Sequence, residues 1–184
     1  MKQRVLIGIG IGLLLIIAGL TYLRSATKKH SPAAVAEYHL GGADITVNYC
    51  QPYKKGRLVF GDEASGALQP YGKYWRVGAN EATLFSTNKN LLINDQHLKA
   101  GKYSIYAYPG KDSWQIVFSS DFDRWGVPQP DPKDDVVKTN VLASNHAPLQ
   151  EQFTIRFDTI DSANVNMVLH WDETEATIPM TVQD

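Results

Sequence analysis

The sequence has one cysteine, Cys50, in 184 residues. A single cysteine excludes a disulfide within the chain, and no activating pattern surrounds it, so we expect a small buried side chain. The sequence also lacks the H-E-x-x-H and Cys-His spacings of zinc sites. We therefore predict no metal and no cofactor. The five histidines are scattered: His30, His39, His97, His146 and His170.

Two further motifs are missing. The acidic segment 119–135 holds five aspartates but lacks the D-x-[DN]-x-[DN]-G spacing and the distant glutamate of a calcium loop, so a solvated loop is favoured over a calcium site. Ser65 lies in a glycine-containing loop without the G-x-S-x-G spacing of a nucleophile elbow. The sequence therefore offers no recognisable metal loop or serine nucleophile.

Excess positive charge is absent after the first thirty residues. Residues 1–30 hold five of the eighteen Lys and Arg residues and no Asp or Glu, which leaves thirteen basic and nineteen acidic residues, a net charge of −6. A domain of that sign lacks the basic surface that nucleic-acid binding requires. We therefore expect no nucleic-acid partner.

The sequence has one long apolar run, residues 5–23, which contains no charge. As a helix it would extend roughly 28 Å, close to the thickness of a bilayer's hydrocarbon core. A cleaved signal peptide is the alternative, but the only clear Ala-x-Ala pattern, Ala34-Val35-Ala36, lies beyond a basic patch. We predict an uncleaved membrane helix with a short basic tail over residues 1–23. The membrane is thus the expected partner of this segment.

The charges on the two sides of this run are nearly balanced, so they do not fix its orientation. The short basic tail favours a domain outside the cytoplasm, in the periplasm or the extracellular space. Residues 24–37 mix small, basic and proline residues without an apolar period, which predicts a stalk or linker. Residues 38–184 then form the predicted domain.

Short stretches with a period of two predict β-strands in this domain. Ile45, Val47 and Tyr49 alternate with polar residues, and segments 103–108 and 114–118 flank a Pro-Gly turn, as in a hairpin. No segment after the apolar run shows a long period of 3.6 residues. The predicted fold is all-β, an antiparallel β-sandwich or jelly roll, with one N-terminal transmembrane helix.

The densest group of aromatic, charged, amide and glycine residues is the signature, residues 70–83, with the sequence PYGKYWRVGANEAT. Its residues, together with Gly56-Arg57, Phe60-Gly61, segment 100–104 and segment 109–112, resemble the bacterial domain-of-unknown-function family 2911. The resemblance covers most of the chain after residue 40. It implies an exported β-rich domain, but it implies no reaction and no catalytic residue.

Two interpretations of the signature remain open. In the first, Arg76 and Glu81 form an ion pair that braces a bent loop, and Trp75 inserts into the core. In the second, aromatic and polar side chains form a ligand site. The candidate ligand-binding residues are Tyr71, Tyr74, Trp75, Arg76, Asn80 and Glu81.

Two functions follow from these interpretations. The favoured one is a non-catalytic binding or envelope-assembly module, anchored in the membrane, for a carbohydrate or peptide ligand. The alternative is a carboxylate-dependent hydrolase acting on an envelope or extracellular glycan. In this case Glu81 would act as acid or base, with Asp121, Asp123 or His97 as its partner.

Overall fold

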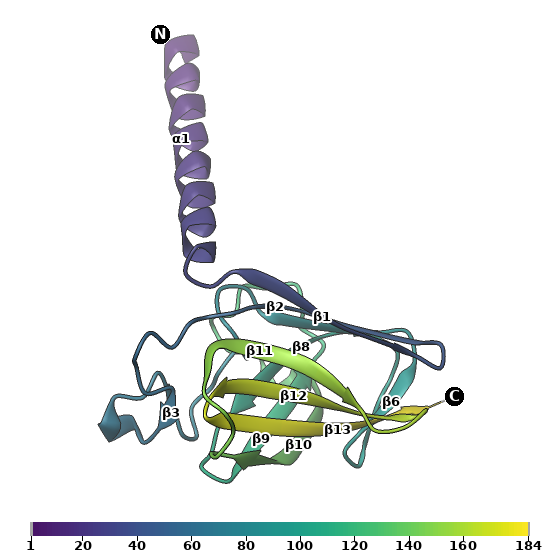
Figure 1. The fold of residues 1–184 in the computed structure, drawn as a ribbon. Helices are drawn as coiled ribbons and strands as arrows, with labels where there is room; N and C mark the ends of the chain where they lie inside the picture. The colour runs from purple at the N-terminus through teal and green to yellow at the C-terminus, as the bar shows by residue number, and fades with distance from the viewer. Residues whose placement is uncertain (1, 184) are drawn as a thin grey trace.

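A long N-terminal helix stands away from a β-rich domain (Figure 1). The computed structural model describes residues 2–183, without the side chains of residues 2–8, 23 and 24. Helix α1 (Lys2–Lys28) is long and apolar enough over Ile9–Lys28 to cross a membrane. Its described leucine and isoleucine side chains are exposed, so the domain does not cover them. A signal sequence near the N-terminus meets the same criteria of length and composition. The basic residues Lys2, Arg4 and Arg24, which bear on the orientation in the membrane, lie outside the described side chains.

The strands form one antiparallel sheet that folds over into two layers, apart from a small parallel pair. The first layer has the order β1 (Ala33–Leu40), β2 (Ala43–Cys50), β5 (Thr83–Thr87), β8 (Gly101–Tyr108), β9 (Ser113–Ser119) and β10 (Asp135–Ser144). The second continues from β10 through β13 (Thr174–Gln183), β12 (Asn164–Asp172) and β11 (Gln150–Thr159), with the hairpin β6 (Asn90–Ile93) and β7 (Gln96–Leu98) beside β13. The parallel pair is β3 (Phe60–Gly61) and β4 (Gln69–Pro70), and two short 3-10 helices are η1 (Glu63–Ser65) and η2 (Pro132–Asp134).

Strand β10 belongs to both layers. Residues 137–142 pair with β9, whereas Ala143 and Ser144 pair with β13. The sheet therefore turns a corner along one strand, and both layers are antiparallel. This arrangement confirms the all-β fold with one N-terminal apolar helix that the sequence predicts.

The core lies between the layers, and the alternating residues of the strands fill it. Ile45 and Val47 of β2 are completely buried, while Asp44 and Asn48, which flank them in the strand, are exposed. A strand with one face on a core has this pattern because successive side chains point to opposite faces. At one end, the core contains an aromatic cluster made of Phe60, Trp75, Trp114, Phe153 and Trp171.

Residues 33–37, which the sequence assigned to the linker, lie in strand β1. This strand pairs with β2 along its whole length, from Ala33 opposite Cys50 to Leu40 opposite Ala43. Only Ala36 and Tyr38 in β1 are buried, because β1 lies at the edge of the sheet. The segment therefore lacks the alternation of apolar and polar residues by which a strand is recognised. The linker between α1 and the first strand is only residues 29–32.

Strands β5 and β6 do not form a hairpin, although an Asn-Lys-Asn turn at residues 88–90 predicts one. Strand β5 pairs with β2 and β8, whereas β6 pairs with β7 and β13 in the other layer. The turn therefore carries the chain between layers. By contrast, the predicted β8–β9 hairpin forms, with Ile105 opposite Phe118.

Candidate functional site

The signature forms a loop from β4 to β5 that lies against the end of β8. Trp75 and Ala107 exchange two backbone hydrogen bonds, each of 2.8 Å, and the Gly72 amide donates to the Pro109 carbonyl at 2.7 Å. The loop thereby covers the outward face of β8. Tyr106 on that face contacts the Tyr74 ring and is only 2% exposed.

The backbone of this loop bends sharply at residues 77–80. Val77, Gly78 and Asn80 have φ angles of 52°, 136° and 62°. A positive φ is a true outlier for a β-branched residue such as Val77, and the surroundings must hold it in place. Gly78 also approaches the chain closely, because a Cβ there would lie 2.9 Å from the Cys50 carbonyl oxygen. The close approach to Cys50 and the positive φ therefore require a glycine at position 78.

Trp75 inserts into the core, as the first of the two interpretations expects. Its side chain is 2% exposed and contacts the other rings of the aromatic cluster, with centroids 5.1–6.2 Å away. Its indole nitrogen donates to the Gly78 carbonyl at 3.3 Å. Trp75 thus fixes the loop to the core and presents little free surface for stacking.

The predicted Arg76–Glu81 ion pair does not form among the described residues. Arg76 Nη1 donates to the backbone carbonyl of Asn80 at 3.4 Å. Glu81 Oε1 lies 3.2 Å from Nζ of Lys28, and its other oxygen accepts from Cys50 Sγ at 3.6 Å. The sharp bend between residues 76 and 81 directs the two side chains to different grooves.

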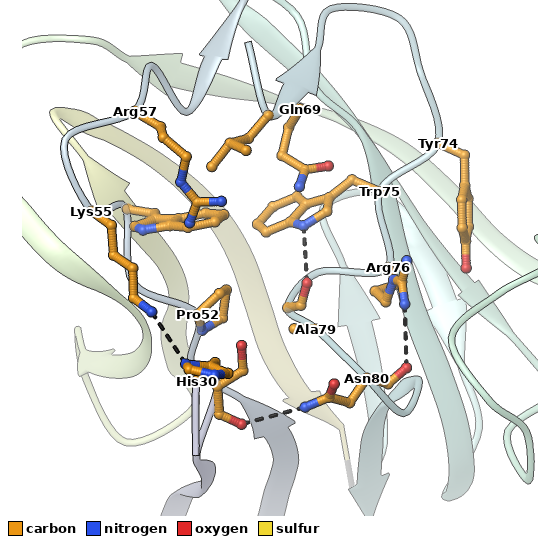
Figure 2. Close-up of a pocket in the computed structure, with 14 residues that line it drawn as sticks. His30, Pro52, Lys55, Arg57, Gln69, Tyr74, Trp75, Arg76, Ala79 and Asn80 are labelled. Carbon is orange, nitrogen blue, oxygen red and sulfur yellow. Dashed lines mark hydrogen bonds between the residues drawn. The ribbon is translucent and has the colours of Figure 1, made fainter. Parts of the chain in front are cut away.

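The main cleft, with a volume of about 590 Å³, lies between the signature loop and the chain that follows α1 (Figure 2). Its floor includes Trp75 and Trp171, and no described carboxylate lines it. The remaining lining residues come from three other segments and the loop: His30, Ser31, Pro52, Lys55, Arg57, Leu68, Gln69, Tyr74, Arg76, Gly78, Ala79 and Asn80.

Arg76 is a half-buried cation in this cleft without an ion-pair partner among the described residues. Its stem is packed closely, because a Cβ on Gly126 would lie 2.5 Å from Arg76 Cδ. Burial lowers the pKa of the guanidinium, as desolvation disfavours the charged form. Buried charges are normally paired, so Arg76 is unusual in having only a carbonyl partner.

Two more cations line the cleft without a described carboxylate partner. Lys55 Nζ donates to His30 Nδ1 at 3.3 Å, and Arg57 donates to the carbonyls of Tyr53 and Lys54. Figure 2 shows the Lys55–His30 pair on one side of the cleft and the Arg76–Asn80 pair on the other. The neighbouring Lys54 differs, since its Nζ lies 2.5 Å from Asp172. The cleft is therefore a concentration of positive charge on a domain with an acidic composition.

The signature residues fall into three places. Tyr74, Trp75, Arg76 and Asn80 line the main cleft. Tyr71 is partly buried, packs against the core and does not line the cleft. Glu81 lines a second groove of about 410 Å³ on the other side of the α1 end.

The second groove contains two of the carboxylates considered for hydrolysis, Glu81 and Asp123, together with Cys50 and Lys28. Partial burial raises the pKa of Glu81, but hydrogen bonds from its own backbone amide and from Lys28 outweigh it, so the pKa is lowered. Burial raises the pKa of the Cys50 thiol, which keeps it protonated and unreactive.

The other predicted partners of Glu81 are engaged elsewhere. Asp121 pairs with Arg124 at 3.1 Å, and His97 contacts Gln183 at 2.9 Å. Within residues 2–183, no three His, Cys, Asp or Glu side chains are grouped closely enough to hold a metal ion. Of the carboxylates considered for hydrolysis, only Asp123 lines the same groove as Glu81.

Sequence reasoning missed His30, Lys55 and Arg57, which join the cleft through long-range folding. His30 follows the helix, and segment 52–57 reaches the site through backbone contacts with β11, such as Lys54 N to Glu151 O at 2.8 Å. The run Lys54-Lys55-Gly56-Arg57 was a usable signal, because three basic residues together stand out in an acidic domain.

Comparison with known proteins adds a family but no activity. No curated protein and no solved structure matches the chain. One family model, described as protein of unknown function (DUF2911), matches residues 31–180. That range begins just before β1 and ends within β13, so it covers the β-rich domain with the signature except for the end of its last strand. It confirms the resemblance seen in the sequence, and the chain therefore belongs to the DUF2911 family of proteins of unknown function.

Proposed function

We propose that this protein is a membrane-anchored, non-catalytic binding module whose main cleft binds a carbohydrate bearing a carboxylate or phosphate group. The observation that carries the proposal is Arg76, a half-buried guanidinium without a described acidic partner. An anionic ligand would supply the missing charge, and guanidinium groups bind carboxylate and phosphate through paired hydrogen bonds. Lys55 and Arg57 add positive charge to the same cleft.

A carbohydrate suits the cleft better than an extended peptide. Peptides commonly bind by adding a strand to an open sheet edge, but loops surround most of this cleft. The amides of Asn80 and Gln69 and the backbone carbonyls of the signature offer both donors and acceptors for hydroxyl groups. The partly exposed ring of Tyr74 supplies an apolar wall, and the buried rings of Trp75 and Trp171 support the cleft from beneath.

The anchor and its orientation are part of this proposal. The exposed apolar side chains of α1 support a membrane location, since water would otherwise surround them. The family resemblance and the short basic tail support a domain outside the cytoplasm. In this arrangement, an envelope glycan or an extracellular glycan is the natural source of the ligand.

The hydrolase alternative has one observation in its favour, the presence of Glu81 and Asp123 in the second groove. A glycoside hydrolase generally needs one carboxyl group that stays protonated and a second that is ionised. The lowered pKa of Glu81 suits only the ionised role. Binding in the main cleft is therefore the better-supported function.

Thermal unfolding of the full chain in detergent tests the proposal with three probes: oligogalacturonate, a neutral cello-oligosaccharide and an acidic peptide. A ligand at one hundred times its Kd stabilises the folded state by about 2.7 kcal/mol. We expect stabilisation by oligogalacturonate that is reduced by about 1.4 kcal/mol in Arg76→Gln, as a tenfold weaker Kd requires, and is kept in Lys102→Gln, an exposed lysine outside the cleft. Equal stabilisation by the neutral sugar, or stabilisation by the peptide alone, would contradict the proposal. Release of reducing ends would favour the hydrolase.

A further inference from the structure

The main cleft begins at the end of the helix that is proposed to anchor the protein. Helix α1 ends at Lys28, and the next residues, His30 and Ser31, already line the cleft. The Ser31 amide still donates to the Thr27 carbonyl at 3.2 Å, so the chain enters the cleft wall directly from the last helical turn. No flexible spacer separates the anchor from the site.

Four contacts fix this connection to the domain. Asn80 Nδ2 donates to the Ser31 carbonyl at 3.4 Å, and Lys55 Nζ donates to His30 Nδ1 at 3.3 Å. The Gln51 amide donates to the Pro32 carbonyl at 2.8 Å, and Lys28 pairs with Glu81. Two of the cleft cations are thus tied to residues 30–31, Lys55 directly and Arg76 through Asn80.

The dimensions of a bilayer place this end of the cleft near the lipid headgroups. The apolar run ends at residue 23, and residues 24–28 continue the helix for about 7.5 Å. Each headgroup layer of a bilayer is about 5–8 Å thick, the difference between the hydrocarbon core and the whole membrane shared between two sides. A helix upright in the membrane would therefore bring His30, Ser31 and Lys55 to the outer boundary of the headgroups.

The geometry points to a ligand that is itself carried by a lipid, namely the phosphate-linked polyhydroxyl ring, a sugar or an inositol, in the headgroup of an anionic lipid in the membrane that holds α1. This inference rests on the proposed function and names the source of its ligand. The phosphate would lie near Lys55 and Arg76, and ring hydroxyl groups would meet the amides of Asn80 and Gln69. A ligand that binds from solution does not require a cleft next to the membrane anchor, whereas a lipid headgroup does.

Hydrogen–deuterium exchange of the full chain in nanodiscs tests the inference. The discs contain phosphatidylcholine alone, with phosphatidylinositol, or with phosphatidylglycerol, which matches the charge of phosphatidylinositol but has no ring. A fourth sample adds soluble glycerophosphoinositol to discs of phosphatidylcholine. We expect phosphatidylinositol to slow exchange in segments 52–57 and 76–80 by about tenfold at ten times its Kd, because only the free state opens. Phosphatidylglycerol should leave the exchange of both segments unchanged.

Two variants connect protection to the cleft. Lys55→Gln should require about ten times more phosphatidylinositol for the same protection, since a hydrogen bond to a charged group contributes about 1.5–3 kcal/mol. Lys102→Gln should behave as the unsubstituted chain. Equal protection by both anionic lipids would overturn the inference in favour of surface charge.

The remaining outcomes separate the inference from the proposed function. Protection by soluble glycerophosphoinositol without protection by phosphatidylinositol discs would overturn the inference that the ligand is carried by a lipid. The proposal that the cleft binds an anionic ligand would then still stand. Protection by none of the three ligands would overturn the inference, and the oligogalacturonate melts would then decide the proposed function separately.

Discussion

Glu81 of the signature lies 3.2 Å from Lys28 at the end of α1, so the helix is joined to the loop that forms both grooves. Both side chains are partly open to water, with 48% of Lys28 and 38% of Glu81 exposed. Exposed ion pairs of this kind stabilise a fold by about 0–1 kcal/mol. The pair therefore positions the helix end more than it stabilises the domain.

Double-mutant cycles should distinguish the pair that forms from the pair that the sequence suggested. Lys28→Ala and Glu81→Ala should show a coupling of up to about 1 kcal/mol in denaturant melts, because each removes the partner of the other. Arg76→Ala and Glu81→Ala should be additive within about 0.5 kcal/mol. A coupling of several kcal/mol between Arg76 and Glu81 would restore the brace and contradict the observed geometry.

Glu81 should also contribute a small pH dependence. Its pKa is lower in the folded protein than its usual value of 4.5, so its contribution is present above that value and disappears as the pH falls through the folded pKa. In Lys28→Ala the pKa of Glu81 should move up, because a hydrogen bond and a favourable charge are lost. Carbon-13 NMR titration of the Glu81 carboxyl would show this change. An unchanged pKa would mean that Lys28 does not contact Glu81 in solution.

The sharp bend of the signature can be tested at two glycines with different surroundings. Gly72 and Gly78 both have positive φ angles, but a Cβ would meet nothing within 4 Å at Gly72 and the Cys50 carbonyl oxygen at 2.9 Å at Gly78. Gly72→Ala should cost about 1–2 kcal/mol from the backbone angle alone. Gly78→Ala should cost clearly more in urea melts, and equal losses would show that the Cys50 contact is unimportant.

The sequence predicted the features that depend on local pattern. The alternation of Ile45, Val47 and Tyr49 identified β2, and the large area that a tryptophan buries was the ground of the interpretation that placed Trp75 in the core, where it lies. Such patterns succeed because side-chain direction in a strand repeats every two residues. The sequence did not predict the edge strand β1, because a strand with few buried residues shows little alternation of apolar and polar residues.

The cleft depended on contacts that no local pattern encodes. Arg76 and Glu81 are five residues apart, yet the left-handed backbone at Val77 and Asn80 separates them. Lys55 donates a hydrogen bond to His30, which lies 25 residues earlier in the chain. Glu81 forms an ion pair with Lys28, which is still further away in the sequence. Charge type alone therefore suggested the wrong partner for Glu81.

The fate of the first thirty residues is a separate prediction. If α1 is an uncleaved anchor, the protein purified from membranes should retain its first residues, because a credible cleavage site is missing near the apolar run. Mass spectrometry of the intact protein would measure this directly. A mature terminus beyond Lys28, in a soluble fraction, would remove the Glu81 partner and the anchor together, and would contradict the membrane-borne ligand.

The most direct test of the binding cleft is Arg76→Gln, measured for stability and for affinity in the same preparation. A half-buried cation without an acidic partner weakens the fold, so its replacement should leave the free energy of unfolding unchanged or raise it by up to about 1 kcal/mol. The same change should weaken oligogalacturonate binding about tenfold in calorimetric titration, since a charged hydrogen-bond donor is lost. Lys102→Gln should alter neither quantity. A loss of stability with unchanged affinity would make Arg76 a structural residue and contradict the assignment of this cleft as the binding site.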